Sequence, residues 1–221
     1  MTLLLDGAMG TELKNRGVDI PLPLWSAEAN IKHPGIVKSI HEDYISSGAD
    51  IITTNTFRTT SWTYKKNKVL NAKKRAKDSL YKAVECAHNA NKNGKIKIAG
   101  SITSIDDCYE PEKFPGINIA TEIYAETLEW IIDAGVDIIL FETMGNIEEI
   151  KCALDTVNSY KIPVWLSLIM RKKNILLDGT DIRVVFNELK KYNLDCILTN
   201  CNSVHFSIET CEWFKKNEIC N

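Results

Sequence analysis

The sequence predicts an α/β protein built from parallel strands, and two regularities carry this prediction. Short apolar runs rich in β-branched residues alternate with longer stretches of helical period along the 221 residues. Several of these runs are apolar throughout, as strands buried on both faces are. In addition, Gly48 and Gly135 each follow a helical stretch and precede a strand, where glycine supplies a left-handed C-terminal cap. Strands that alternate with helices are joined by right-handed crossovers and therefore run parallel.

In chain order, the apolar runs predict six strands, at residues 3–6, 50–54, 96–101, 137–142, 164–169 and 195–200. Six amphipathic helices are expected at residues 34–47, 72–90, 121–134, 148–158, 181–192 and 207–216. In the first of these helices, Ile36, Val37, Ile40 and Tyr44 fall on one stripe. A doubly wound sheet needs five or six such strand–helix units, whereas a (β/α)8 barrel needs eight and about 250 residues. Periodicity alone does not choose between them.

Composition restricts the classes of function. The chain has 27 Lys and Arg against 29 Asp and Glu, so we expect neither a nucleic-acid nor a membrane partner. No apolar run approaches the roughly 18 residues that a membrane span needs, and Asp6 interrupts the first run, so no signal peptide is expected. Seven scattered cysteines without a CxxC pair predict a cytoplasmic protein rather than a disulfide scaffold. No linker or repeat divides the chain, which favours a single domain over residues 1–221.

Polar residues follow five of the six predicted strands. The segments are Asp6-Gly7-Ala8-Met9-Gly10, Thr53-Thr54-Asn55-Thr56, Gly100-Ser101, Glu142-Thr143 and Asn200-Cys201-Asn202. In parallel α/β proteins this edge of the sheet is where ligands bind. Helix capping is the alternative explanation, because Asp, Ser, Thr and Asn are preferred caps. Capping explains neither Glu142 nor Cys201, which are poor caps, so these two are candidate functional residues.

Six collinear blocks resemble the zinc-dependent homocysteine S-methyltransferases. They are LLLDGAMGTELKNRG, LWSAEANIKHPGIVKSIHEDYISSGADIITTNTF, AGSITSIDDCYEP, DIILFETMGNIEEI, LDGTDIRVV and LTNCNS, and they extend from Leu3 to about Ser203. The resemblance implies a (β/α)8 barrel of the TIM-barrel type, of which about six units are present. It also implies transfer of a methyl group to the sulfur of homocysteine, giving methionine. The blocks LWSA and LDGT look more like the small members that use S-methylmethionine or S-adenosylmethionine as donor.

The resemblance also assigns residues. Cys201 matches the first zinc thiolate of the family, and Asp6 and Glu142 match carboxylates that hold the ammonium group of homocysteine. The backbone around Gly7 and Ala8, together with Thr54 and Asn55, matches the region that lines the pocket near the amino-acid head group. No residue is assigned a catalytic role beyond these.

The chemistry of such a site is consistent with these residue types. A free thiol with a pKa near 8.5 is mostly protonated at neutral pH, and Zn²⁺ bound to its sulfur lowers that pKa. Three cysteine thiolates and one exchangeable position would suit a sulfur substrate. Methyl transfer is then a displacement at carbon, which depends mainly on alignment.

The chain departs from the family at its C-terminal side. The other two zinc thiolates of the family are an adjacent Cys-Cys pair, and no adjacent cysteines occur here. Cys211 and Cys220 lie nearby in the sequence as candidate replacements, but Cys211 falls in a helical stretch and Cys220 is the penultimate residue. Cys108 follows the third predicted strand, and nothing in its motif makes it a ligand. We therefore expect a C-terminally incomplete barrel, marginal as a monomer and inactive unless a partner supplies the rest. The oligomeric state is not predicted.

Two rival functions remain open from the sequence. One is a non-catalytic homocysteine-binding or interaction protein that kept Asp6 and Glu142 but lost the metal, and zinc content separates it from the enzyme. The other is an α/β enzyme that uses Cys201 as a covalent nucleophile, for which thiol alkylation after complete zinc chelation would be diagnostic.

Overall fold

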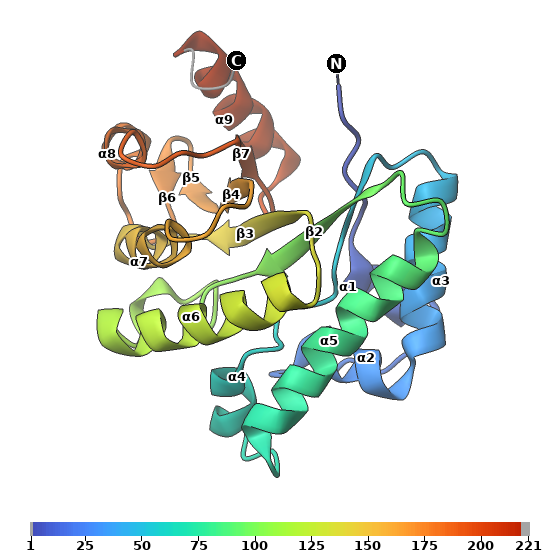
Figure 1. Cartoon of the computed structure of the whole chain (residues 1–221). Coiled ribbons are helices and arrows are strands. Elements are labelled where there is room, and N and C mark those ends of the chain that lie inside the picture. The colour runs from blue at the N-terminus through green and yellow to red at the C-terminus, as the bar shows by residue number, and fades with distance from the viewer. Residues whose placement is uncertain (1, 218–221) are drawn as a thin grey trace. The chain divides into compact units, whose positions relative to one another are not determined.

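The computed structural model describes residues 2–217, and the chain divides into two compact units. The first unit comprises Met1–Ile102 and Glu126–Ile139, and the second comprises Thr103–Ala125 and Leu140–Asn221. The helices are α1 (Met9–Asn15), η1 (Trp25–Glu28), α2 (Ala29–Lys32), α3 (Pro34–Ser46), α4 (Ser61–Lys66), α5 (Ala72–Ala90), η2 (Pro111–Lys113), α6 (Ile117–Asp133), α7 (Ile147–Val157), α8 (Ile182–Leu189) and α9 (Val204–Lys216), where η marks a 3₁₀ turn (Figure 1). The strands are β1 (Ile51–Thr53), β2 (Lys97–Ile102), β3 (Ile138–Met144), β4 (Val164–Leu168), β5 (Met170–Lys172), β6 (Ile175–Leu176) and β7 (Cys196–Thr199).

Five strands form the main sheet, in the order β1-β2-β3-β4-β7, and β5 and β6 form a separate antiparallel pair. Within the first unit β1 pairs in parallel with β2, and within the second unit β4 pairs in parallel with β7. The strands of the main sheet follow one another in chain order. A doubly wound sheet reverses its strand order at a switch point, whereas a barrel does not. The observed order therefore favours the barrel type that periodicity left open.

In the first unit, α5 packs against α2, α3 and α4, and α1 packs against α3. The apolar stripes of these helices meet in a core, as their periodicity predicts. This core contains Leu13, Val18, Ile20, Ala29, Val37, Ile40 and Cys86, with Met9, Trp25, Ile36 and Tyr44 packed against it.

In the second unit, aromatic rings pack between neighbouring elements. Tyr124 of α6 meets Phe141 of β3 edge to face, with ring centroids 5.8 Å apart. Phe186 of α8 packs on Trp213 and Phe214 of α9 at centroid distances of 5.3 and 5.2 Å. Such contacts stabilise beyond the area that they bury, by about 0.5–1.5 kcal/mol each.

Aspartates placed just before strands bind the start of the neighbouring strand. Asp50 accepts a hydrogen bond from the Leu4 N–H at 2.8 Å, and Asp137 accepts one from the Ile98 N–H at 2.8 Å. In the second unit Asp195 accepts from the Val164 N–H at 2.9 Å. These bonds satisfy backbone donors where strand pairing begins.

The predicted elements agree with the structure except at short segments. The five later strands and all six helices are found, most of them within one to three residues of the predicted bounds. Residues 3–6 are a partial exception, because they pair in parallel with β1 only through the bridge between Leu5 and Ile51. The short helices α1, α2 and α4 and the β5–β6 hairpin were not predicted, since segments this short show little periodicity.

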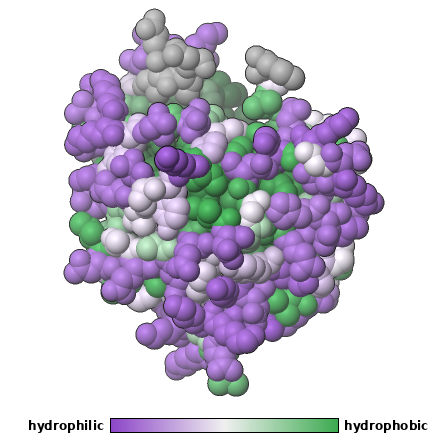
Figure 2. Space-filling view, viewed as in Figure 1, coloured by the Kyte–Doolittle hydropathy of each residue, from purple (hydrophilic) through white to green (hydrophobic). Residues whose placement is uncertain are grey.

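Hydrophilic side chains cover most of the face drawn in Figure 2, as expected for helices whose polar stripes face solvent. Within residues 2–217, no helix combines the length and the apolar character that crossing a membrane requires.

Candidate functional site

Asp6 lies where the N-terminal segment leaves β1. Its backbone N–H donates to the Ile51 carbonyl at 3.0 Å, and its carboxylate accepts from the Thr53 N–H at 2.8 Å. Asp6 is half-buried, and the next two residues, Gly7 and Ala8, are exposed. The carboxylate and the following backbone are thus held at the carboxyl end of β1, where the sequence predicted a site.

Thr54 and Asn55, also predicted to line the pocket, are buried and fully engaged with the protein. The Asn55 amide donates to the Asn30 Oδ1 at 2.8 Å and to the Ser26 carbonyl at 3.0 Å, and its oxygen accepts from the Ser26 hydroxyl at 2.6 Å. Asn30 in turn donates to the Asn55 carbonyl at 2.9 Å. The Thr54 hydroxyl bonds the Thr56 hydroxyl at 2.7 Å. These two side chains therefore fix the loop after β1 and have no donor directed at solvent.

In the second unit, Glu142 and Cys201 join one hydrogen-bonded cluster. Asn200, which follows β7, donates from Nδ2 to the Glu142 carboxylate at 3.3 Å, to the Thr143 hydroxyl at 2.9 Å and to the Cys201 sulfur at 3.5 Å. The Thr143 hydroxyl donates to the Cys201 sulfur at 3.7 Å, and the Thr143 N–H donates to the Asn200 Oδ1 at 3.0 Å. Asn200 and Thr143 thus link the ends of β3 and β7, and their hydrogen bonds include Glu142 and Cys201.

Two residues of this cluster have backbone conformations that side chains with a Cβ rarely adopt. Thr143 has φ +59° and Cys201 has φ +56°. For a β-branched residue such as Thr143 this left-handed conformation is a clear outlier, and such strain concentrates at functional sites. Of these two residues, Cys201 is exposed and Thr143 is buried.

The loop after β2 brings a further residue to Cys201. Tyr109 lies near the sulfur of Cys201, and partial burial, followed by the proximity of this sulfur, raises the pKa of the phenol. Glu149 of α7 anchors the same loop, because its carboxylate accepts from the Ile105 N–H at 2.7 Å and from the Tyr124 hydroxyl at 3.1 Å. Burial raises the pKa of Glu149, against the effect of these hydrogen bonds. Sequence reasoning did not assign Tyr109, and its position in the Asp107-Cys108-Tyr109 loop was the available signal.

The described residues do not fit a complete zinc site. Residues 2–217 contain no group of three or more His, Cys, Asp or Glu side chains arranged to hold a metal. Cys108 is buried, Cys211 is exposed on α9, and Cys220 lies outside the described residues. Cys201 is the one predicted ligand that the structure places in the cluster.

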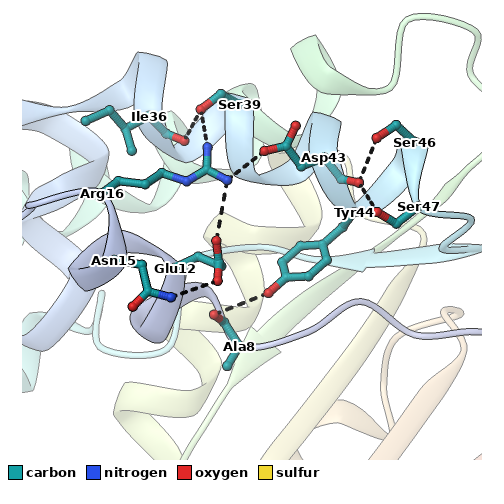
Figure 3. Close-up of polar contacts among 10 residues, drawn as sticks. All are labelled: Ala8, Glu12, Asn15, Arg16, Ile36, Ser39, Asp43, Tyr44, Ser46 and Ser47. Atoms are coloured by element: carbon teal, nitrogen blue, oxygen red, sulfur yellow. Dashed lines mark hydrogen bonds and ion pairs between the residues drawn. The ribbon is translucent and has the colours of Figure 1, made fainter.

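Tyr44 of α3 contacts the turn that carries Asp6. Its hydroxyl donates to the Ala8 carbonyl at 3.4 Å (Figure 3). Sequence reasoning placed Tyr44 only on the apolar stripe of its helix, because period-3.6 patterns describe one element and not its contacts with a distant turn.

Comparison with known proteins identifies the family. A family model described as homocysteine S-methyltransferase matches residues 3–220. The chain is 28% identical over 205 residues to the homocysteine S-methyltransferase of Escherichia coli, covering 86% of this chain and 66% of that protein. It is also 28% identical over 211 residues to a selenocysteine methyltransferase of Astragalus bisulcatus, covering 81% of this chain and 62% of that protein.

Solved structures give the same result. The metallated form of the homocysteine methyltransferase MmuM from Escherichia coli superposes with a TM-score of 0.87 at 25% identity, covering 98% of this chain and 80% of that chain. Its apo form superposes with a TM-score of 0.78. The chain spans 66% or less of the length of these two curated relatives. On the match over residues 3–220, the chain belongs to the homocysteine S-methyltransferase family.

Proposed function

We propose that this chain carries the amino-acid-binding part of an enzyme that transfers a methyl group to the sulfur of homocysteine and forms methionine. The observation that carries the proposal is the cluster of Glu142, Asn200 and Cys201 at the ends of β3 and β7. A strained, hydrogen-bonded group of this kind, which exposes one thiol beside one carboxylate, has no capping role. Membership of the family supplies the reaction class.

The residues of the chain have separate tasks in this proposal. Glu142 and Asp6 supply the anionic partners that the substrate ammonium group needs. The exposed backbone at Gly7 and Ala8 lines the head-group pocket, while buried Thr54 and Asn55 hold the neighbouring loop in place. Orienting the thiol toward the methyl donor is the main contribution that such residues make to a displacement at carbon.

A metal is part of the proposal only through the family. One of the MmuM structures similar to this chain is a metallated form, and zinc is the metal that the sequence resemblance implies. Cys201 is the residue of this chain that would bind it. The other ligands would come from outside the described residues, from a further polypeptide or from a second copy.

For the methyl donor we propose a sulfonium compound, S-methylmethionine or S-adenosylmethionine. The support is the resemblance of the segments LWSA and LDGT to family members that use these donors. We expect the methyl group to move from sulfonium sulfur to the homocysteine sulfur, leaving the donor as a neutral thioether.

The test is to incubate the chain with homocysteine, each donor in turn and added zinc. Mass spectrometry then measures the methionine that is formed. We expect Glu142→Gln to raise the KM for homocysteine at least tenfold, since each lost charge-assisted hydrogen bond contributes about 1.5–3 kcal/mol. Glu148→Gln, an exposed position of α7, is the matched control and should leave the KM unchanged. Equal KM values for the two variants would contradict the role of Glu142.

A homocysteine-binding protein without catalysis is the second candidate function. The lack of a three-ligand metal group among residues 2–217 favours it. Calorimetric binding of homocysteine with no methionine formed at any zinc concentration would establish this candidate and exclude the enzyme.

A further inference from the structure

Two aromatic rings lie against the turn that carries Asp6, at the positions of its two glycines. A Cβ atom placed on Gly7 would lie 2.8 Å from the hydroxyl oxygen and 2.9 Å from Cε1 of Tyr44. A Cβ atom on Gly10 would lie 2.8 Å from Nε1 of Trp25. Contacts this short do not occur between real side chains, so each ring occupies the space that a side chain would need.

The position of Tyr44 is fixed from the other side by a polar cluster between α1 and α3, drawn in Figure 3. Arg16 donates to the Asp43 carboxylate at 2.6 Å and to the Ser39 hydroxyl at 2.9 Å. Its guanidinium also lies 3.5 Å from the Glu12 carboxylate. Because Asp43 directly precedes Tyr44, these bonds hold the last turn of α3 on α1. In this position of α3 the Tyr44 ring lies against Gly7.

The hydroxyl of Tyr44 adds a polar contact to this packing. It points toward the Ala8 carbonyl and donates to it at 3.4 Å (Figure 3). Burial, and then the charges of Glu12 and Asp6, raise the pKa of Tyr44 while Arg16 opposes them. The phenol therefore keeps its proton at neutral pH and remains a donor to the turn.

Trp25 supports the opposite end of the turn. It adopts φ +52°, and its backbone N–H donates to the Pro21 carbonyl at 2.8 Å. The Lys14 ammonium lies 4.6 Å from the centroid of its ring. Trp25 and Tyr44 thus pack against the two ends of the segment from Gly7 to Gly10, in which Gly7 and Ala8 are exposed.

We propose that Tyr44 is a positioning residue for the amino-acid head group of the substrate, acting through the turn Asp6-Gly7-Ala8. It sets the place of the carboxylate and backbone atoms that would bind the substrate, and it is the reason that position 7 is glycine. This proposal rests on the proposed function, because it assumes that the turn binds homocysteine.

A double-mutant cycle on Gly7 and Tyr44 tests the proposal, with the dissociation constant of homocysteine measured by calorimetry on the full chain. Gly7→Ala forces the ring or the turn to move, and we expect it to weaken binding about tenfold. Tyr44→Ala should weaken binding by a similar factor. In the double variant the added methyl group enters the space that the ring left, so the two effects should not multiply.

Tyr44→Phe removes only the hydroxyl and keeps the packing, so it remains measurable if Tyr44→Ala does not fold. It should weaken binding a few-fold. Tyr81→Phe is the matched control, since it removes a hydrogen bond to Asp133 on the same unit without touching the turn. Its affinity should equal that of the wild type.

The outcomes separate the two proposals. A wild-type chain that does not bind homocysteine overturns the proposed function and this inference with it. A wild type that binds, with Gly7→Ala and Tyr44→Phe at wild-type affinity, overturns the inference alone. Coupling that appears in the melting temperature but not in the affinity also overturns it, because the contact would then serve only stability.

Discussion

His41 of α3 is fully buried, and neither of its ring nitrogens has a hydrogen-bond partner among the described residues. Burial lowers the pKa of this imidazole from 6.5 to about 4. The folded protein therefore holds His41 neutral at a pH where an unfolded chain would bind a proton. A buried histidine of this kind makes stability depend on acidity.

We predict that the stability contributed by neutral His41 is present above pH 6.5 and decreases as the pH falls toward 4. Relative to neutral pH, this difference in pKa lowers the free energy of unfolding by about 3 kcal/mol below pH 4 and by about 2 kcal/mol at pH 5. Urea unfolding at pH 7.5 and pH 5 measures it. His41→Leu should lose that part of the pH dependence, whereas His205→Leu on the exposed surface of α9 should retain it. An unchanged pH dependence in His41→Leu would contradict this assignment.

The amide pair of Asn30 and Asn55 predicts a second residue-level effect. Asn30→Ala leaves the buried Asn55 amide without the acceptor that lies 2.8 Å away and removes the donor to Ser79. An unsatisfied buried group costs about 1–3 kcal/mol. Thermal unfolding should therefore show a clear loss of stability for Asn30→Ala, whereas Asn15→Ala, at an exposed position, should be about as stable as the wild type. Equal losses in the two variants would show that the network adds nothing.

At the scale of elements, aspartates connect the start of one strand to the next. Asp50, Asp137 and Asp195 each precede a strand and accept from the first N–H groups of its neighbour. The strands predicted from the sequence at residues 50–54, 137–142 and 195–200 each begin with one of these aspartates. The structure adds the reason, which is that parallel pairing leaves a backbone donor at the amino end of the sheet.

We predict that Asp50→Ala lowers the free energy of unfolding by about 1 kcal/mol, since it removes a charge-assisted hydrogen bond to Leu4. Asp50→Asn keeps an acceptor oxygen and should recover most of this loss. Asp19→Ala, at an exposed position of the same unit, is the control. If Asp50→Asn is as unstable as Asp50→Ala, the negative charge rather than the hydrogen bond is what matters.

Helix boundaries show the same agreement between local pattern and structure. Thr60, Asn146, Asp181 and Ser203 each cap a helix with a side-chain oxygen. Asn146 accepts from both Glu148 and Glu149 and begins α7 directly after the candidate residues of β3. Residues next to the site cap these helices, and neither Glu142 nor Cys201 does so. This supports a separate role for Glu142 and Cys201.

At the scale of the whole molecule, metal content distinguishes the proposed functions. Tight zinc binding requires about four ligands, and the described residues place one thiol in the candidate cluster. We predict that the purified 221-residue chain retains far less than one zinc per chain after exhaustive dialysis. Elemental analysis measures this directly. One zinc per chain that disappears in Cys201→Ser but not in Cys211→Ser would contradict the prediction and show that further ligands reach Cys201.

Much of the fold could be predicted because its causes are local. An apolar run with β-branched residues forms a buried strand and a stripe at helical spacing forms a packed helix, wherever they occur in the chain. That polar residues lie at the carboxyl ends of β1 and β3 could also be predicted, because parallel strands deliver their carboxyl ends to one edge, whereas their role in binding stays a prediction. The prediction of one barrel domain over residues 1–221, with eight units in the complete protein, stays a prediction.

The amino-acid sequence by itself determined the order of strands and helices, the strand-end candidates Asp6, Glu142 and Cys201, and the family. Only the tertiary structure decided what those candidates touch. It showed that Asn30 and Ser26 satisfy the hydrogen bonds of the Asn55 amide, and that Tyr109 lies near the sulfur of Cys201. The reason is physical: these partners are 25 to 92 residues apart in the sequence, and the packing of whole elements, not the period of any one of them, brings them together.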